Sequence, residues 1–170
     1  MDEISMASIG KILVIYDSKT GNTEKMAYAI AEGAKKVGGI KVEVKKADET
    51  TMENLKEADG IIIGSPTYYG QMSAKIKNLI DRSVEIDGKL EGKVGAAFTS
   101  SGGTASGAET TLFSILQAML IHGMIIQGRP RAKHYGAAAV GTPSKEEVQS
   151  CHDLGERTAN LVIRLTKEKR

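Results

Sequence analysis

Cysteine, net charge and long apolar runs are scarce in this chain of 170 residues. Its one cysteine, Cys151, excludes a disulfide within the chain and an all-cysteine metal site. A lone cysteine also fits a reducing compartment, so we expect a cytoplasmic protein without a metal centre. The formal net charge is only +2, so charge gives no support for a nucleic-acid partner. No apolar stretch approaches the ~18 residues of a membrane span, and none is expected.

What is present is typical of a globular domain. Hydrophobic residues make up 41% of the chain and charged residues 26%. The length suits one domain with one sizeable core. The first residues are acidic (Asp2 and Glu3), unlike the basic start of a signal peptide. We expect residues 1–10 to be a short leader and residues 11–170 to form the domain.

Short apolar segments alternate with amphipathic ones along the whole chain. Strands are predicted at Lys11–Tyr16, Ile40–Lys46, Gly60–Gly64, Val94–Ser100 and Met124–Gln127, with a short extra strand or turn at Ala137–Val140. Helices are predicted at Asn22–Val37, Met52–Glu57, Ser73–Val84, Ala108–His122 and Ser144–Lys167. This alternation predicts an α/β fold, in which a five-stranded parallel sheet lies between two layers of helices.

Ligands of such sheets bind at the carboxyl ends of the strands, so the loops there are informative. After the first strand, the chain places hydroxyls, one glycine and a helix start together, at Ser18, Lys19, Thr20, Gly21, Asn22 and Thr23. Helix N-termini carry unpaired N–H groups and attract anions, so this loop predicts a phosphate site. The alternative is an ordinary helix cap, but six such residues in a row favour phosphate. Neither a G-x-G-x-x-G dinucleotide loop nor a P-loop is present.

Two further loops suit a flat ligand. The loop after the third strand combines two tyrosines with a glycine, in Pro66, Thr67, Tyr68, Tyr69, Gly70 and Gln71. Its rings could stack on an aromatic system, although one tyrosine could simply pack over the sheet edge. The loop after the fourth strand is small and polar, and it includes Ser100, Ser101, Gly102, Gly103 and Thr104. A flexible linker would be unusual at this place, so we expect this loop to wrap a planar ligand.

These residues resemble a known family. Val14–Thr23, followed by Ala27 and Ile30, resembles the FMN-binding signature of flavodoxins. Four downstream segments resemble WrbA-type NAD(P)H:quinone oxidoreductases of that superfamily, namely Pro66–Met72, Thr99–Gly107, His122–Met124 and Tyr135–Ala137. The resemblance covers roughly residues 11–166. Two features differ from the WrbA type: an insertion is missing between Asp48 and Leu55, and the chain has no tryptophan, which those proteins often carry near Ser83–Gly88.

The resemblance implies a flavodoxin-like fold with non-covalently bound FMN. Residues 18–23 would hold the phosphate, while residues 66–71 and 100–104 would border the isoalloxazine ring. His122 would lie near the flavin face as a catalytic residue, where it could hydrogen-bond or protonate a reduced quinone. The alternative for His122 is a cation that caps the last turn of its helix.

The reaction implied by the resemblance is a ping-pong transfer of two electrons from NAD(P)H, through FMN, to a quinone-like acceptor. The alternatives are a flavodoxin that shuttles electrons between redox proteins and, less favoured, a flavin-free scaffold or sensor. Shuttles usually carry a strongly acidic face, whereas this chain has a pI of about 8.6, which favours the enzyme. A homo-oligomer, either dimer or tetramer, is also expected.

Overall fold

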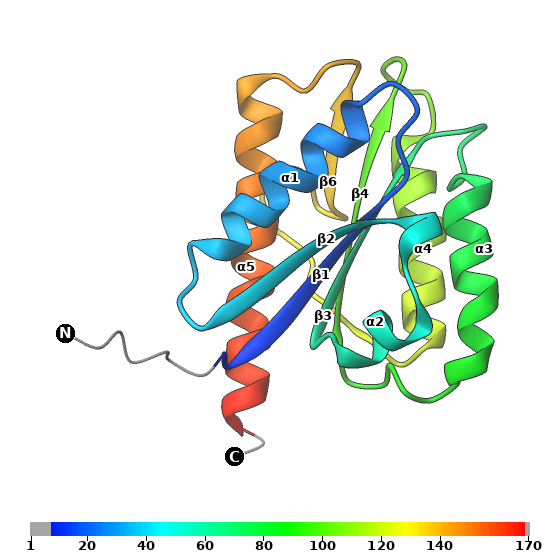
Figure 1. Cartoon of the computed structure of the whole chain (residues 1–170). Coiled ribbons are helices and arrows are strands. Elements are labelled where there is room, and N and C mark those ends of the chain that lie inside the picture. Colours follow the sequence, from blue (N-terminus) through cyan, green and yellow to red (C-terminus); the bar gives the residue numbers. More distant parts are fainter. Residues whose placement is uncertain (1–7, 169–170) are drawn as a thin grey trace.

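Six strands form one parallel sheet in the computed structural model, which describes residues 8–168 (Figure 1). They are β1 (Gly10–Tyr16), β2 (Ile40–Lys46), β3 (Gly60–Pro66), β4 (Val94–Ser101), β5 (Ile125–Ile126) and β6 (Ala137–Val140). The order is β2-β1-β3-β4-β5, and β6 also pairs with β4. The chain winds outward in both directions from β1 and β3, which makes the carboxyl ends of these two strands the expected place for a ligand. Residues 1–7 of the expected leader lie outside the described residues.

The fifth strand of the predicted sheet is split in two. β5 pairs with Val94 and Gly95, while β6 pairs with Phe98–Ser101, so both strands lie along the same edge of β4. Gly128 and Pro130 lie in the connection, where neither suits a continuous strand. Arg157 holds this connection by donating from Nη1 to the Gly128 carbonyl at 3.2 Å. The segment 137–140, for which a strand or a turn was expected, is therefore a strand of the sheet.

Helices cover both faces of the sheet, as the sequence predicts (Figure 1). One face is covered by α1 (Asn22–Lys35) and α5 (Lys145–Glu168), and the other by α2 (Met52–Glu57), α3 (Ala74–Arg82) and α4 (Ala108–Ile121). Two short 3-10 helices, η1 (Ala47–Glu49) and η2 (Ser83–Ile86), complete the elements. Successive side chains of β1 enter opposite cores: Ile12 and Val14 face α1 and α5, while Leu13 and Ile15 face the other helices. None of the helices within residues 8–168 is both long and apolar enough to cross a bilayer.

The helices α1 and α5 approach each other unusually closely at two glycines. A Cβ atom on Gly33 would lie 2.1 Å from the carbonyl oxygen of His152, and one on Gly155 would lie 1.9 Å from that of Ile30. Both distances are far below van der Waals contact, so only glycine permits this approach. The contact matters because α1 begins at the carboxyl edge of the sheet, where its orientation positions the candidate site.

The helix starts differ in a way that bears on function. Side chains cap α2 and α3, through Thr51 and Ser73 respectively. In contrast, α1 and α4 begin at Gly21 and Gly107, which have no side chain to offer. Both glycines have a left-handed backbone, with φ of 87° and 94°. The N-termini of α1 and α4 therefore remain open at the carboxyl edge of the sheet.

Candidate functional site

The first turn of α1 presents a row of unpaired backbone donors. Within residues 8–168, the N–H groups of Asn22, Thr23 and Glu24 make no hydrogen bond, and the first helical bond runs from Lys25 to the Gly21 carbonyl. The amide of Gly21 donates to Ser18 Oγ at 3.1 Å, which leaves the Ser18 hydroxyl proton available. Free amides at the positive end of a helix dipole are able to bind an anion.

A buried pair of hydroxyls joins the first loop to the loop after β4. Thr23 Oγ1 and Ser100 Oγ lie 2.8 Å apart, and both side chains are almost completely shielded from water. One hydroxyl donates to the other, so the second keeps its proton free for a ligand. The tertiary structure thus brings together two loops that lie 77 positions apart in the sequence.

A second hydroxyl network fixes the end of β3 against the end of β4. Thr99 Oγ1 donates to the Ser65 carbonyl at 2.7 Å, so the Thr67 hydroxyl must donate to Thr99 Oγ1, at 2.8 Å. The amide of Thr67 also donates to the Ser100 carbonyl at 2.8 Å. Thr99 is fully buried and positions Thr67, a role that sequence reasoning did not assign to it.

The two tyrosines lie on a tight turn. Tyr68 and Gln71 exchange backbone hydrogen bonds at 3.1 and 3.0 Å, and the central residues, Tyr69 and Gly70, both have positive φ, at 50° and 72°. These are the features of a type I′ turn, in which a tyrosine is strained by about 1 kcal/mol or more. Tyr69 is nonetheless fully exposed, so burial does not compensate for the strain. Strain without packing is typical of a residue that is kept for a functional contact.

A cavity of about 330 Å³ lies where these loops meet. It is lined by Lys19, Thr20, Asn22, Thr23, Pro66, Thr67, Tyr68, Ser100, Ser101, Gly102 and Gly141. Its volume lies within the range of small-molecule sites. Lys19 is the one lining residue that carries a charge at neutral pH, which suits an anionic ligand that is bound mostly by neutral donors.

Seven of the expected cofactor-binding residues do not line this cavity. These are Ser18, Gly21, Tyr69, Gly70, Gln71, Gly103 and Thr104. Ser18 and Gly21 shape the start of α1, whereas Tyr69, Gly70 and Gln71 build the tight turn beside the cavity. The carbonyl of Gly103 accepts a hydrogen bond from Ser101 Oγ at 2.9 Å, so Gly103 fixes the side chain of a residue that lines the cavity.

Gly141 is a lining residue that sequence reasoning missed. Its amide donates to the Ser101 carbonyl at 2.8 Å, which draws the chain after β6 over the cavity. The sequence predicts either a strand or a turn at Ala137–Val140, so it does not place Gly141 at the carboxyl edge of the sheet. The available signal was that any strand of a parallel sheet delivers its following loop to the same edge.

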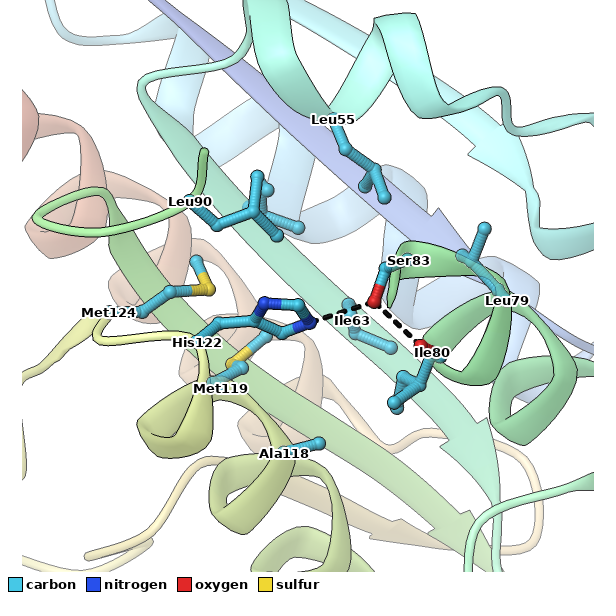
Figure 2. A pocket seen from close by; sticks show the side chains of 11 residues that line it. Leu55, Ile63, Leu79, Ile80, Ser83, Leu90, Ala118, Met119, His122 and Met124 are labelled. Carbon is cyan, nitrogen blue, oxygen red and sulfur yellow. Dashed lines mark hydrogen bonds between the residues drawn. The ribbon is translucent and has the colours of Figure 1, made fainter. Parts of the chain in front are cut away.

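His122 lies in a different place from the one expected (Figure 2). Its imidazole Nε2 is 2.7 Å from Ser83 Oγ, and the Ser83 hydroxyl donates to the Ile80 carbonyl at 2.6 Å. Because Ser83 has one proton, His122 Nε2 must carry a proton and donate it. The surrounding cavity holds only about 20 Å³ and is otherwise lined by apolar side chains, including Leu55, Ile63, Leu79 and Leu90.

Within one chain, His122 therefore lies apart from the larger cavity, at which FMN is expected. α4 starts at Gly107, next to the tight turn, and runs for 14 residues before His122. At 1.5 Å per residue, His122 lies about 20 Å along the helix from that loop. Its side chain joins the C-terminal end of α4 to the end of α3.

Replacing His122 with alanine is expected to lower the free energy of unfolding by about 1 kcal/mol, through the loss of the bond to Ser83. The affinity for FMN is expected to remain unchanged, because the imidazole is remote from the cradle. Urea denaturation and an FMN titration of the same preparation measure the two effects. A large loss of FMN affinity with unchanged stability would contradict this placement of His122.

Fold and site together define a class: a doubly wound α/β protein of the flavodoxin type, with a cavity at the switch point of the sheet, where such folds bind their ligands. The sequence model of a family described as NADPH-dependent FMN reductase matches residues 41–134. A flavodoxin from Aquifex aeolicus is 42% identical over 162 residues, which cover 91% of this chain and 88% of that protein. An NAD(P)H dehydrogenase (quinone) from Archaeoglobus fulgidus is 39% identical over 191 residues, covering 92% of this chain and all of that protein.

Solved structures agree with these relatives. The WrbA-like flavodoxin from Agrobacterium tumefaciens superposes with a TM-score of 0.78 at 27% identity, covering 91% of this chain and 98% of that one. An archaeal flavodoxin superposes with a TM-score of 0.75 at 29% identity, covering 89% and 98% respectively. The chain belongs to the NADPH-dependent FMN reductase family within the flavodoxin superfamily. The resemblance that its motifs suggested is thereby confirmed.

Proposed function

We propose that this protein is an FMN-dependent oxidoreductase that transfers two electrons from NAD(P)H to a quinone-like acceptor. The observation that carries the proposal is the cradle itself: three unpaired amides at the start of α1, next to a cavity of about 330 Å³. Relatives named NAD(P)H dehydrogenase (quinone), at 39% and 34% identity, support the choice of substrates. The cytoplasm is the proposed location, in keeping with a single cysteine that is free and buried.

The residues of the cradle fit FMN. The free amides of Asn22, Thr23 and Glu24, with the hydroxyls of Ser18 and Thr20, would hold the phosphate dianion. A Cβ on Gly21 would meet no atom within 4 Å, so nothing shields this helix start from a ligand. The remaining expected residues, 66–71 and 100–104, together with Gly141, would border the flavin ring.

Bound FMN supplies the hydride and electron chemistry, which no amino-acid side chain provides. The chain's own residues would bind FMN, orient it and leave it accessible to the substrates. Thr99 and Thr67 hold the two ring-side loops at a set separation, while the type I′ turn projects Tyr69 outward. Tyr68, 42% exposed, lies on the wall of the cavity, where NAD(P)H and the acceptor would take turns. Ping-pong order follows, because one open face serves both substrates.

Steady-state oxidation of NADH and of NADPH by the FMN-loaded protein, with benzoquinone as acceptor, tests the proposal. Parallel initial-rate lines at varied acceptor concentrations are expected, as ping-pong kinetics require. Free FMN at the same concentration is the control for non-enzymatic transfer. Failure to bind FMN would contradict both the proposed cofactor and the proposed reaction. FMN binding without turnover would contradict only the proposed reaction.

A flavodoxin acting as an electron shuttle is the second candidate. It is supported by relatives named flavodoxin that are 42% and 38% identical over most of the chain. A shuttle would bind FMN equally well, would be reduced by a redox protein and would show no turnover with NADH or NADPH. The net charge of +2 gives no sign of the acidic surface that such docking usually uses.

A further inference from the structure

Glu24 places a carboxylate in the first turn of α1, next to the proposed phosphate position. Counted from the cap residue Gly21, it is the third residue of the helix. A glutamate at this position commonly turns back and accepts a hydrogen bond from the amide of the cap residue. The positive end of the helix dipole favours that arrangement further. The chain thus carries, beside the cradle, an anionic side chain that is able to compete with a phosphate for the same amides.

The Glu24 carboxylate is engaged elsewhere in the structure. Its Oε1 accepts a hydrogen bond from the hydroxyl of Tyr16 at 2.5 Å, and no amide of residues 8–168 donates to it. This length is typical of a hydroxyl that donates to a carboxylate, a bond roughly twice as strong as one between neutral groups. The amide of Gly21 donates to Ser18 Oγ instead, so the usual capping bond of such a glutamate is not made.

Tyr16 is a rigid anchor for this carboxylate. It is the last residue of β1, is only 3% exposed and belongs to the core beneath α1 and α5. Burial, followed by the hydrogen bond to Glu24, raises the pKa of the phenol above its ordinary value, so the hydroxyl keeps its proton and acts as the donor. Because the buried ring is fixed by packing, the place of its hydroxyl determines where the Glu24 carboxylate lies.

A second carboxylate near the cradle has a different kind of partner. Asp17 directly precedes Ser18, and its Oδ1 lies 4.0 Å from the ammonium group of Lys75. Within residues 8–168, no cationic side chain lies that close to the Glu24 carboxylate, which is held by a neutral hydroxyl. A carboxylate without a cation remains available to another positive partner, and the start of its own helix is such a partner.

We propose that Tyr16 is a positioning residue for phosphate recognition: its hydroxyl keeps the Glu24 carboxylate out of the cradle and so leaves the start of α1 open to the phosphate of FMN. The inference rests on the proposed binding of FMN at α1. Without the hydroxyl, Glu24 turns onto the free amides, where its charge competes with the phosphate and repels it. The loops beside the flavin ring do not take part, so the loss falls on the phosphate alone.

The ratio of the Kd for riboflavin to the Kd for FMN isolates the phosphate, because riboflavin has the same ring system and lacks only this group. Quenching of flavin fluorescence gives both Kd values. In Tyr16→Phe, the Kd for FMN is expected to rise about tenfold, while that for riboflavin stays within about twofold of the wild-type value. Adding Glu24→Gln to this variant is expected to restore the wild-type ratio, because the competing charge is then absent.

Tyr28→Phe is the matched control. It removes the hydroxyl of the neighbouring tyrosine, which is 52% exposed, and leaves the bond between Tyr16 and Glu24 in place, so the wild-type ratio is expected. Glu24→Asp offers a second route to the same effect, which covers the case that the Tyr16 variant misfolds. Aspartate keeps the charge, but its shorter side chain does not reach the Tyr16 hydroxyl, so a lower ratio is expected.

The outcomes separate this inference from the proposed function. A wild type that binds FMN no more tightly than riboflavin would contradict the cradle at α1 itself. A wild type that prefers FMN, with the same preference in Tyr16→Phe and in Glu24→Asp, would overturn only the role of Tyr16. A lower preference in Tyr16→Phe that Glu24→Gln does not restore would overturn it as well, since the hydroxyl would then act other than through Glu24.

Discussion

An aspartate in place of Thr20 is expected to raise the Kd for FMN by about 100-fold. Thr20 lines the cavity beside the unpaired amides of the α1 N-terminus. The substitution removes a hydroxyl donor and places a carboxylate next to the proposed phosphate position. Two unit charges 4 Å apart repel by about 4 kcal/mol at an effective dielectric constant of 20. Solvent at this exposed position weakens that repulsion, and about 3 kcal/mol corresponds to the expected loss.

The matched control for this variant is Thr51→Asp. Thr51 caps α2, and aspartate caps a helix at least as well as threonine, so the same charge is added at a helix start without loss of stability. Quenching of flavin fluorescence during titration gives the two Kd values. Equal FMN affinity in the wild type and in both variants would show that the phosphate does not bind at α1, and the proposed cradle would have to be abandoned.

Alanine at Gly155 is expected to lower the free energy of unfolding by about 3 kcal/mol. Its Cβ would lie 1.9 Å from the carbonyl oxygen of Ile30 and 2.8 Å from the amide nitrogen of Ala34. Both are backbone atoms in α1, so neither can rotate away as a flexible side chain would. The two helices must separate, and the packing of both against the sheet is lost in part. For a chain of this length, the midpoint of thermal unfolding should fall by about 10 °C.

Gly38→Ala is the control for this variant. No atom lies within 4 Å of the position of its Cβ, and its backbone does not require a positive φ. Its stability should therefore match that of the wild type, or exceed it by less than about 1 kcal/mol. Urea denaturation followed by circular dichroism, at one fixed protein concentration, compares the three proteins. A Gly155→Ala protein within about 1 kcal/mol of the wild type would mean that α1 and α5 are free to move apart.

Features that depend only on residues adjacent in the sequence could be predicted from the sequence. The runs Lys11–Tyr16 and Gly60–Gly64 are apolar at every or nearly every position, which indicates strands covered on both faces. Residues 18–23 form one continuous segment, so their hydroxyls, glycine and helix start predict an anion site without knowledge of the fold. The alternation of strands and helices then predicts that all loops after strands meet at one edge.

Features that depend on distance between elements required the tertiary structure. His122 follows the same helix that begins beside the site, and only the length and direction of α4 carry it about 20 Å away. Gly141 and Thr99 gain their roles from hydrogen bonds to other strands, which no local pattern records. The approach of Gly155 to α1 is likewise a property of two helices that lie more than 100 positions apart.

The sequence by itself thus determined the sandwich, the proposed cradle at the start of α1 and the resemblance to FMN-binding proteins, because each rests on short-range patterns of polarity and backbone freedom. The tertiary structure alone decided how four strand-end segments enclose one cavity, why the edge strand is split, and where His122 lies. It also decided which side of the apolar helix α4 remains uncovered, since the sequence of a helix that is apolar all round does not indicate which side faces the sheet.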